Sequence, residues 1–175
     1  MQKNILITGP PGIGKTTLIR KLAEALPSFA PCGFFTEEIR ERGIRKGFEL
    51  KSFDGRTRVL GHVDLQGSSR VGRYGVDLPA FEDFLEALPF AGSAGRLVII
   101  DEIGRMECLS SRFCDVTRSL LDSTTPVLAT VALRGTGFIE EVKRRPDIIL
   151  IEITRGNRAR LAQELADRIR PLLSS

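Results

Sequence analysis

Short and almost uninterrupted apolar runs recur along the chain. They occupy Asn4–Thr8, Arg96–Asp101, Pro126–Val131 and Ile148–Ile153. Aliphatic runs of this kind are typical of strands that are buried on both faces, as in a parallel sheet covered by helices. The sequence therefore predicts four buried strands.

Segments with helical periodicity fill most of the intervals between these runs. In Lys15–Leu26 the apolar residues recur on one helical face, and Pro27 and Pro31 follow as helix breakers. This alternation predicts an α/β fold whose mostly parallel sheet is flanked by helices. The other predicted helices are Asp77–Leu88, Phe113–Leu121, Phe138–Arg145 and Asn157–Leu172, with Asp77 and Asn157 at N-cap positions.

Residues 33–62 break the alternation. Glycines at 43, 47 and 55 separate two or three short strand patterns, and Asp54-Gly55 is typical of a hairpin turn. The 175 residues contain no linker or internal repeat. We therefore predict a single domain spanning residues 1–175, within which residues 33–62 form a β-rich excursion.

A phosphate-binding motif follows the first apolar run. Residues 9–16 read Gly-Pro-Pro-Gly-Ile-Gly-Lys-Thr, which fits the P-loop pattern between a strand and a helix. Backbone N–H groups and the helix N-terminus would hold phosphate, Lys15 would reach the β- and γ-phosphates, and Thr16 would bind Mg²⁺. The residues predicted to bind the nucleotide here are Gly9, Pro10, Pro11, Gly12, Ile13, Gly14, Lys15, Thr16 and Thr17.

A pair of carboxylates ends the second apolar run. In P-loop proteins a carboxylate at the end of a neighbouring strand holds magnesium, and Asp101 suits that role. Glu102 is then placed to polarise a water at the γ-phosphate, which favours hydrolysis. Thr130, at the end of the third run, is either a sensor of the γ-phosphate or an ordinary strand threonine.

The developing charge on a transferred phosphoryl group calls for a further cation. Arg105 and Arg134 follow the second and third runs, while Arg70 and Arg73 lie in a loop rich in glycine and serine. The sequence does not rank these four arginines, and each of them is also typical of a solvated surface position.

Composition excludes several other classes. No apolar stretch approaches the ~20 residues that cross a bilayer, and no secretion signal is present, so we expect a cytoplasmic protein without a membrane partner. Cys32, Cys108 and Cys114 show neither zinc nor disulfide spacing. The net charge of +4 suits polyphosphate but does not by itself argue for nucleic acid. The oligomeric state cannot be read from the sequence.

Several longer stretches carry a resemblance to a known family. The chain resembles the THEP-type, or cancer-related, nucleoside triphosphatases over nearly its whole length, and these stretches are more specific than the P-loop. They are residues 9–17, Gly33-Phe-Phe-Thr-Glu-Glu-Ile-Arg40, Val71-Gly-Arg-Tyr-Gly-Val-Asp77, Asp101-Glu-Ile-Gly-Arg-Met-Glu107 and Gly137-Phe-Ile-Glu-Glu-Val-Lys143.

The resemblance implies magnesium-dependent hydrolysis of nucleoside triphosphates with weak preference among bases. It also implies a RecA-like core, in which one strand separates the strands that carry the two phosphate motifs. Asp101 and Glu102 would then hold magnesium and water, and Ile103, Gly104 and Arg105 would form the adjoining nucleotide-side loop. Arg105 stands where many relatives carry lysine, which preserves the charge but not the geometry.

For two further segments, the sequence leaves two roles open. Thr36, Glu37 and Glu38 either line the site or form the exposed face of a hairpin. Residues 154–158, Thr-Arg-Gly-Asn-Arg, either contact the base or form a turn with a helix cap. No Asn-Lys-x-Asp motif for guanine is present.

Two rival functions stay open as well. One is a small-molecule or nucleotide kinase, which would need an acceptor pocket. The other is a nucleotide-switched RNA-binding module, for which acidic neighbours dilute the basic surface. That surface would consist of Arg40, Arg42, Arg45, Lys46, Lys51, Arg56 and Arg58.

Overall fold

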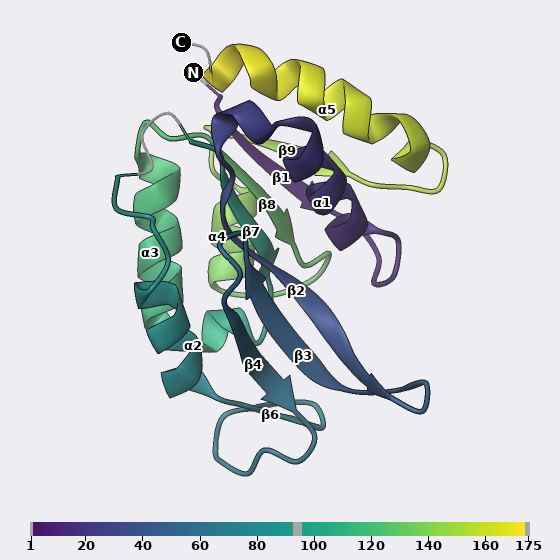
Figure 1. Ribbon diagram of the computed structural model, residues 1–175, viewed down its shortest axis with the longest axis vertical. Coiled ribbons are helices and arrows are strands. Elements are labelled where there is room, and N and C mark those ends of the chain that lie inside the picture. Colours follow the sequence, from purple (N-terminus) through teal and green to yellow (C-terminus); the bar gives the residue numbers. More distant parts are fainter. Residues whose placement is uncertain (1, 93–95, 174–175) are drawn as a thin grey trace.

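The four apolar runs form adjacent parallel strands. In the computed structural model, which describes residues 2–92 and 96–173, the described strands belong to one nine-stranded sheet (Figure 1). Its parallel part has the order β7-β8-β1-β9, so β8 separates the strands that precede the two phosphate motifs, as the RecA-like arrangement requires. These strands are β1 (Asn4–Thr8), β7 (Val98–Ile103), β8 (Val127–Val131) and β9 (Ile148–Glu152).

The β-rich excursion is continuous with this sheet. Residues 32–34 pair in parallel with residues 98–100 of β7, after which β2 runs on and pairs antiparallel with β3. The strands are longer than the short ones predicted, and the Asp54-Gly55 turn joins β3 to β4 as expected. The strands of this half are β2 (Cys32–Glu41), β3 (Ile44–Ser52), β4 (Thr57–His62), β5 (Arg70–Val71) and β6 (Tyr74–Val76).

Helices cover both faces of the sheet (Figure 1). Apolar residues of α1 and α5 pack on one face, against β1 and β8, and those of α2, α3 and α4 pack on the other. Within the described ranges no helix is long and apolar enough to cross a bilayer. The helices are α1 (Lys15–Ala25), α2 (Leu78–Glu86), α3 (Ser111–Asp122), α4 (Phe138–Lys143) and α5 (Arg158–Leu173), with short 3₁₀ turns at Pro27–Phe29 and Glu107–Leu109.

Helix ends follow the local chemistry of the sequence. Asp77 caps α2, because its Oδ1 accepts a hydrogen bond from the N–H of Ala80 at 3.0 Å. Helix α1 ends at Ala25, two residues before Pro27. Asn157 directly precedes α5 as predicted, but its Oδ1 accepts from the N–H of Thr154 at 2.8 Å and so closes the preceding turn.

The junction of the two halves of the sheet depends on a glycine. Gly33 has φ +109°, and a Cβ at this position would lie 2.0 Å from the carbonyl oxygen of Ile99 in β7. No side chain fits there, because this distance is far below van der Waals contact. Gly33 therefore lets β2 approach β7 and join the antiparallel half to the parallel core.

We expect Gly33→Ala to lower the free energy of unfolding by about 3 kcal/mol or more, because strain and a backbone clash add. Gly43→Ala is the matched control: Gly43 has φ +79°, but a Cβ there meets nothing within 4 Å. Its cost should be about 1–2 kcal/mol. Urea unfolding measures both values, and equal losses would contradict the role of the close approach.

Candidate functional site

The predicted phosphate loop forms a turn between β1 and the N-terminus of α1. The N–H of Ile13 donates to the carbonyl of Pro10 at 3.3 Å, and Gly14 enters the helix with φ +111°. That angle lies in the region open mainly to glycine. The loop thus presents successive N–H groups at a positive helix end, which is an arrangement that binds polyanions.

Asp101 lines the same cleft as this loop, and only 1% of the residue is exposed. Its Oδ2 accepts from Thr16 Oγ1 at 2.7 Å and from the N–H of Thr36 at 3.4 Å, and its Oδ1 accepts from Thr130 Oγ1. Hydroxyls or amides of β2, β8 and α1 therefore converge on one carboxylate in the second half of β7. The structure brings the two predicted phosphate motifs together.

These oxygens suit a hard divalent cation. Burial raises the pKa of Asp101, whereas the hydrogen bonds from Thr130 and Thr16 oppose that shift. A nearby cation would favour the ionised carboxylate, and oxygen is the ligand type that Mg²⁺ prefers. Among residues 2–92 and 96–173, no group of three or more His, Cys, Asp or Glu is arranged so that it could hold a metal ion by itself.

Glu102 lies beside the phosphate-loop lysine. Lys15 Nζ is 3.6 Å from Glu102 Oε2 and donates to the carbonyl of Gly9 at 3.1 Å. Burial raises the pKa of Glu102, and the charge of Lys15 opposes this rise. A carboxylate whose pKa is moved toward neutrality is a better proton acceptor than an ordinary surface glutamate.

A further carboxyl, Glu107, is buried next to Glu102. A Cβ placed on Gly104 would lie 2.8 Å from Glu107 Oε2 and 3.0 Å from Glu102 Oε1, so both carboxyls face the same small volume. Burial, followed by the charge of Glu102, raises the pKa of Glu107 to about 8. Glu107 is thus largely protonated at neutral pH. Sequence reasoning assigned it no role, because a glutamate in a motif does not reveal its own burial.

A cleft of about 890 Å³ connects these groups. Arg105 and Arg134 both line it, and no carboxylate of the described residues lies within ion-pair distance of either guanidinium. Thr36, Glu37 and Glu38 also line it from the β2–β3 hairpin, where the two glutamates are partly exposed, so the two interpretations of that segment do not exclude each other. Of the predicted nucleotide-binding residues, those on the cleft wall are Gly9, Pro11, Gly12, Gly14, Lys15, Thr16, Thr17, Asp101, Glu102 and Arg105.

Other predicted residues lie elsewhere. Ile103 is buried in the core with α2, α3 and α4, and Ile13 packs toward α1 and α5. Pro10 and Gly104 belong to the same two loops but do not line the cleft. Thr130 Oγ1 donates to Asp101 Oδ1, so Thr130 is more than an ordinary strand threonine, and its contact with the γ-phosphate stays a prediction.

Arg70 and Arg73 bind the backbone of their own loop and of β3. Arg70 donates to the carbonyls of Leu65 and Arg73, and Arg73 donates to the carbonyl of Arg45. Neither arginine lines the cleft. Both arginines therefore stabilise this loop through hydrogen bonds to backbone carbonyls, and neither side chain reaches the phosphate loop.

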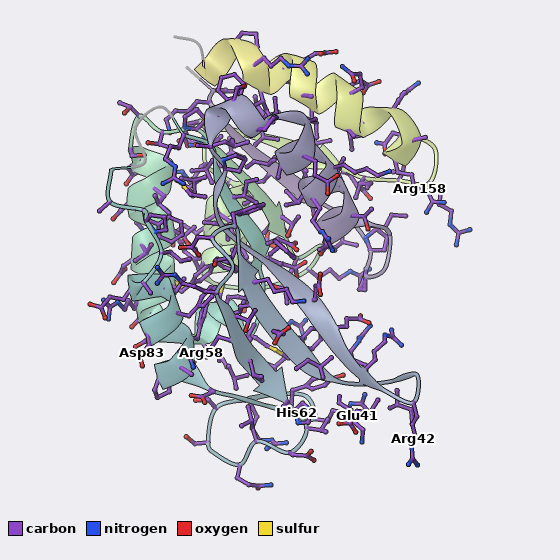
Figure 2. All side chains as sticks on the ribbon, viewed as in Figure 1. Glu41, Arg42, Arg58, His62, Asp83 and Arg158 are labelled. Carbon is purple, nitrogen blue, oxygen red and sulfur yellow. The ribbon has the colours of Figure 1, made fainter. Side chains whose placement is uncertain are left out.

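The predicted base loop at 154–158 closes on itself. Asn157 N–H donates to Thr154 Oγ1 at 3.3 Å, in addition to the bond that the Thr154 N–H donates to Asn157. This is the turn that the sequence offered as one alternative. Figure 2 shows Arg158 at the start of α5, pointing away from the sheet.

The predicted basic surface is divided. Figure 2 places Arg42 at the tip of the β2–β3 hairpin and Arg58 near α2, at separate positions of the antiparallel half. Several of its other members pair with carboxylates: Arg40 and Arg45 with Glu38, Lys51 with Glu37 and Glu49, and Arg56 with Asp54.

Known proteins are similar to this chain in sequence. Residues 4–166 match the protein family described as NTPase. The chain is 43% identical over 162 residues to the nucleoside-triphosphatase THEP1 of Thermotoga sp. (strain RQ2), covering 92% of each chain. It is 37% identical to the human cancer-related nucleoside-triphosphatase, covering 94% of this chain and 95% of that one.

A solved structure agrees with the fold. The crystal structure of THEP1 from Aquifex aeolicus superimposes with a TM-score of 0.83 at 33% identity, covering 95% of this chain and 98% of that chain.

The raised pKa of Glu107 makes stability depend on pH. The ordinary value is 4.5, so between about pH 4.5 and 8 the folded state holds a proton that the unfolded chain has lost. The unfolded state binds fewer protons, so the free energy of unfolding falls by about 1.4 kcal/mol per pH unit as pH rises through this window. Glu107→Gln should lack this contribution.

We expect the stability of Glu107→Gln relative to wild type to increase by about 3–4 kcal/mol between pH 5 and pH 8. Urea unfolding without nucleotide or metal at these two pH values measures the change. The exposed Glu24→Gln on α1 serves as control and should follow wild type. A wild-type pH dependence in Glu107→Gln would show that the buried carboxyl is not the titrating group.

Proposed function

The chain belongs to the NTPase family and hydrolyses nucleoside triphosphates; on that premise we propose that hydrolysis depends on magnesium, tolerates different bases and uses Glu102 as general base. The observation that carries this proposal is the contact of Thr16 with Asp101 at 2.7 Å, with Lys15 and Glu102 directly beside it. The phosphate loop, the proposed magnesium ligands and the proposed general base thus line one cleft.

Phosphate binding follows from the loop. The N–H groups between Gly9 and Thr17 would hold the polyphosphate at the positive end of α1. Lys15 would exchange its contact with Glu102 for one with the β- and γ-phosphates, because a polyphosphate carries more charge than one carboxylate. Binding would thereby free Glu102 from its ion pair.

Thr16 and Asp101 would hold Mg²⁺, while Thr36 and Thr130 fix the orientation of the Asp101 carboxylate. When bound, the ion would neutralise charge on the β- and γ-phosphate oxygens. Preorganised hydrogen bonds hold the carboxylate in place before the ligand arrives, which reduces reorganisation during the reaction.

Glu102 would accept a proton from the attacking water as the water oxygen bonds to the γ-phosphorus. The bond from that phosphorus to the bridging oxygen breaks, and the products are a nucleoside diphosphate and phosphate. Lys15 would stabilise the charge that develops, and Arg105 or Arg134 would add a second positive group, since both line the cleft.

Tolerance of different bases would follow from the closed turn at 154–157, whose amide and hydroxyl are engaged with each other. The divided and ion-paired basic surface gives no support to an RNA partner. We also propose that the protein is cytoplasmic. This part of the proposal rests on the composition of the chain.

We expect Glu102→Gln to lower kcat for phosphate release by about 10²–10⁴-fold, because the amide cannot accept the proton of water. Nucleotide affinity, measured by calorimetry with a non-hydrolysable analogue, should change little. The exposed Glu24→Gln again serves as control. Near-normal turnover of Glu102→Gln would assign the base to another group.

Asp101→Asn should raise the Mg²⁺ concentration for half-maximal activity at least about tenfold, because it removes a charged oxygen ligand. A magnesium titration of phosphate release measures this value. Asp54→Asn, in the distant β3–β4 turn, is the matched control and should keep the wild-type midpoint. Identical midpoints in all three proteins would exclude Asp101 as a ligand.

A further inference from the structure

The cleft extends well beyond the groups that hydrolysis requires. From Asp101 and Glu102 it continues past β2 and β3 to Leu60 on β4 and Val71 on β5. Strand β4 lies three positions from β7 in the sheet, about 14 Å at the usual strand spacing. A water molecule at the γ-phosphate occupies only a small part of this space.

The remote end of the cleft differs from the phosphate end in chemistry. The phosphate end presents glycines, Lys15 and threonines, whereas the remote end is lined by Phe48, Leu60, Val71 and Met106. Apolar walls with a few polar groups are typical of pockets for small organic molecules, and a volume of about 890 Å³ accommodates both a polyphosphate and such a molecule.

The sheet register builds this remote end. Phe48 stands directly opposite Glu38 on one side and Gly61 on the other. Gly61 carries no side chain, and a Cβ there would lie 3.1 Å from the sulfur of Met106, so Met106 covers this part of the sheet. The pocket floor is therefore made by paired strands, with a register shift between Phe48 and Glu49, and Met106 covers it from the segment after β7.

Polar groups at its edge would orient an occupant. The guanidinium of Arg45 lies 5.6 Å from the centre of the Phe48 ring and forms an ion pair with Glu38. Its Nε is buried and, among the described residues, has no hydrogen-bond partner. The rest of the guanidinium is accessible, since the Arg45 side chain is 40% exposed, so an acidic group on a bound molecule would pair with it at this edge.

We propose that the remote end, formed by Phe48, Leu60, Val71 and Met106, is a second-ligand pocket that binds a small organic molecule with a flat apolar body while the nucleotide is bound. This inference rests on the proposed function, which directs the γ-phosphate toward Asp101 and Glu102. The polyphosphate would run from the γ-phosphate at Asp101 and Glu102 back along the phosphate loop at the N-terminus of α1, so the base would leave on the α1 side and away from β4. The second ligand would therefore lie on the γ-phosphate side.

The test uses the dye 1-anilinonaphthalene-8-sulfonate, which has a flat apolar body and an acidic group. Wild-type protein saturated with Mg²⁺ and a non-hydrolysable triphosphate analogue is titrated with the dye, and fluorescence reports binding. We expect one dye per chain. Val71→Trp, which fills the pocket, should weaken dye binding at least about tenfold, and Phe48→Ala, which removes the flat wall, should also weaken it.

Val59→Trp is the matched control. Val59 is next to Leu60 on β4 but lies on the other face of the strand, is 37% exposed and does not line the cleft. It should bind the dye as wild type does. Displacement of the dye by the analogue, absence of binding, or equal weakening in Val59→Trp and Val71→Trp would overturn the proposal.

Phosphate release by wild-type protein without dye is measured in parallel. Its absence would contradict the proposed function, whereas a failure of dye binding beside normal phosphate release would contradict the second pocket alone. Thermal melting of each variant distinguishes a filled pocket from an unfolded chain. If Val71→Trp does not fold, the comparison of Phe48→Ala with Val59→Trp decides the outcome.

Discussion

The buried carboxylate of Asp101 is the group on which the arrangement of the site depends. An isolated charge at 1% exposure is costly, and the structure offsets this cost with hydrogen bonds from three separate elements. The hydrogen bond from Thr16 fixes the distance between the carboxylate and the phosphate loop. Those from Thr36 and Thr130 fix its distances to β2 and β8. Because all three partners are short side chains or backbone on packed elements, the carboxylate has little freedom to move.

This constraint also explains why the antiparallel half of the sheet matters for the site. Strand β2 supplies Thr36, and its position beside β7 depends on the close approach at Gly33. The same strand continues to Glu37 and Glu38, and β3 and β4 extend the floor of the cleft. The excursion is thus part of the functional surface, and the site is shared between the parallel core and the antiparallel half.

The sequence predicted those features that local chemistry determines. Aliphatic runs gave the four parallel strands, Pro27 gave the end of α1, and the glycines with Lys15 and Thr16 gave the phosphate loop. The meeting of Asp101 with the phosphate loop was predicted from the two motifs. Other features that depend on residues distant in the sequence were not predictable, since periodicity says nothing about which strands pair. The contact of Thr36 with Asp101 and the burial of Glu107 are of this kind. Strand β2 is also longer than the short strands predicted, since it continues through a second half that carries charged residues and is partly open to solvent.

Charge balance near the γ-phosphate sets the chemistry that the cleft supports. Three carboxyls, at 101, 102 and 107, lie close together in a region that also receives a polyphosphate. Glu107 is largely protonated at pH 7 because its pKa is raised to about 8, so it adds little repulsion there. Lys15 opposes the rise in the pKa of Glu102. In the proposed mechanism, a bound phosphate would draw the ammonium away. The loss of that contact would raise the proton affinity of Glu102 when a water needs a base, so that substrate binding itself would prepare the base.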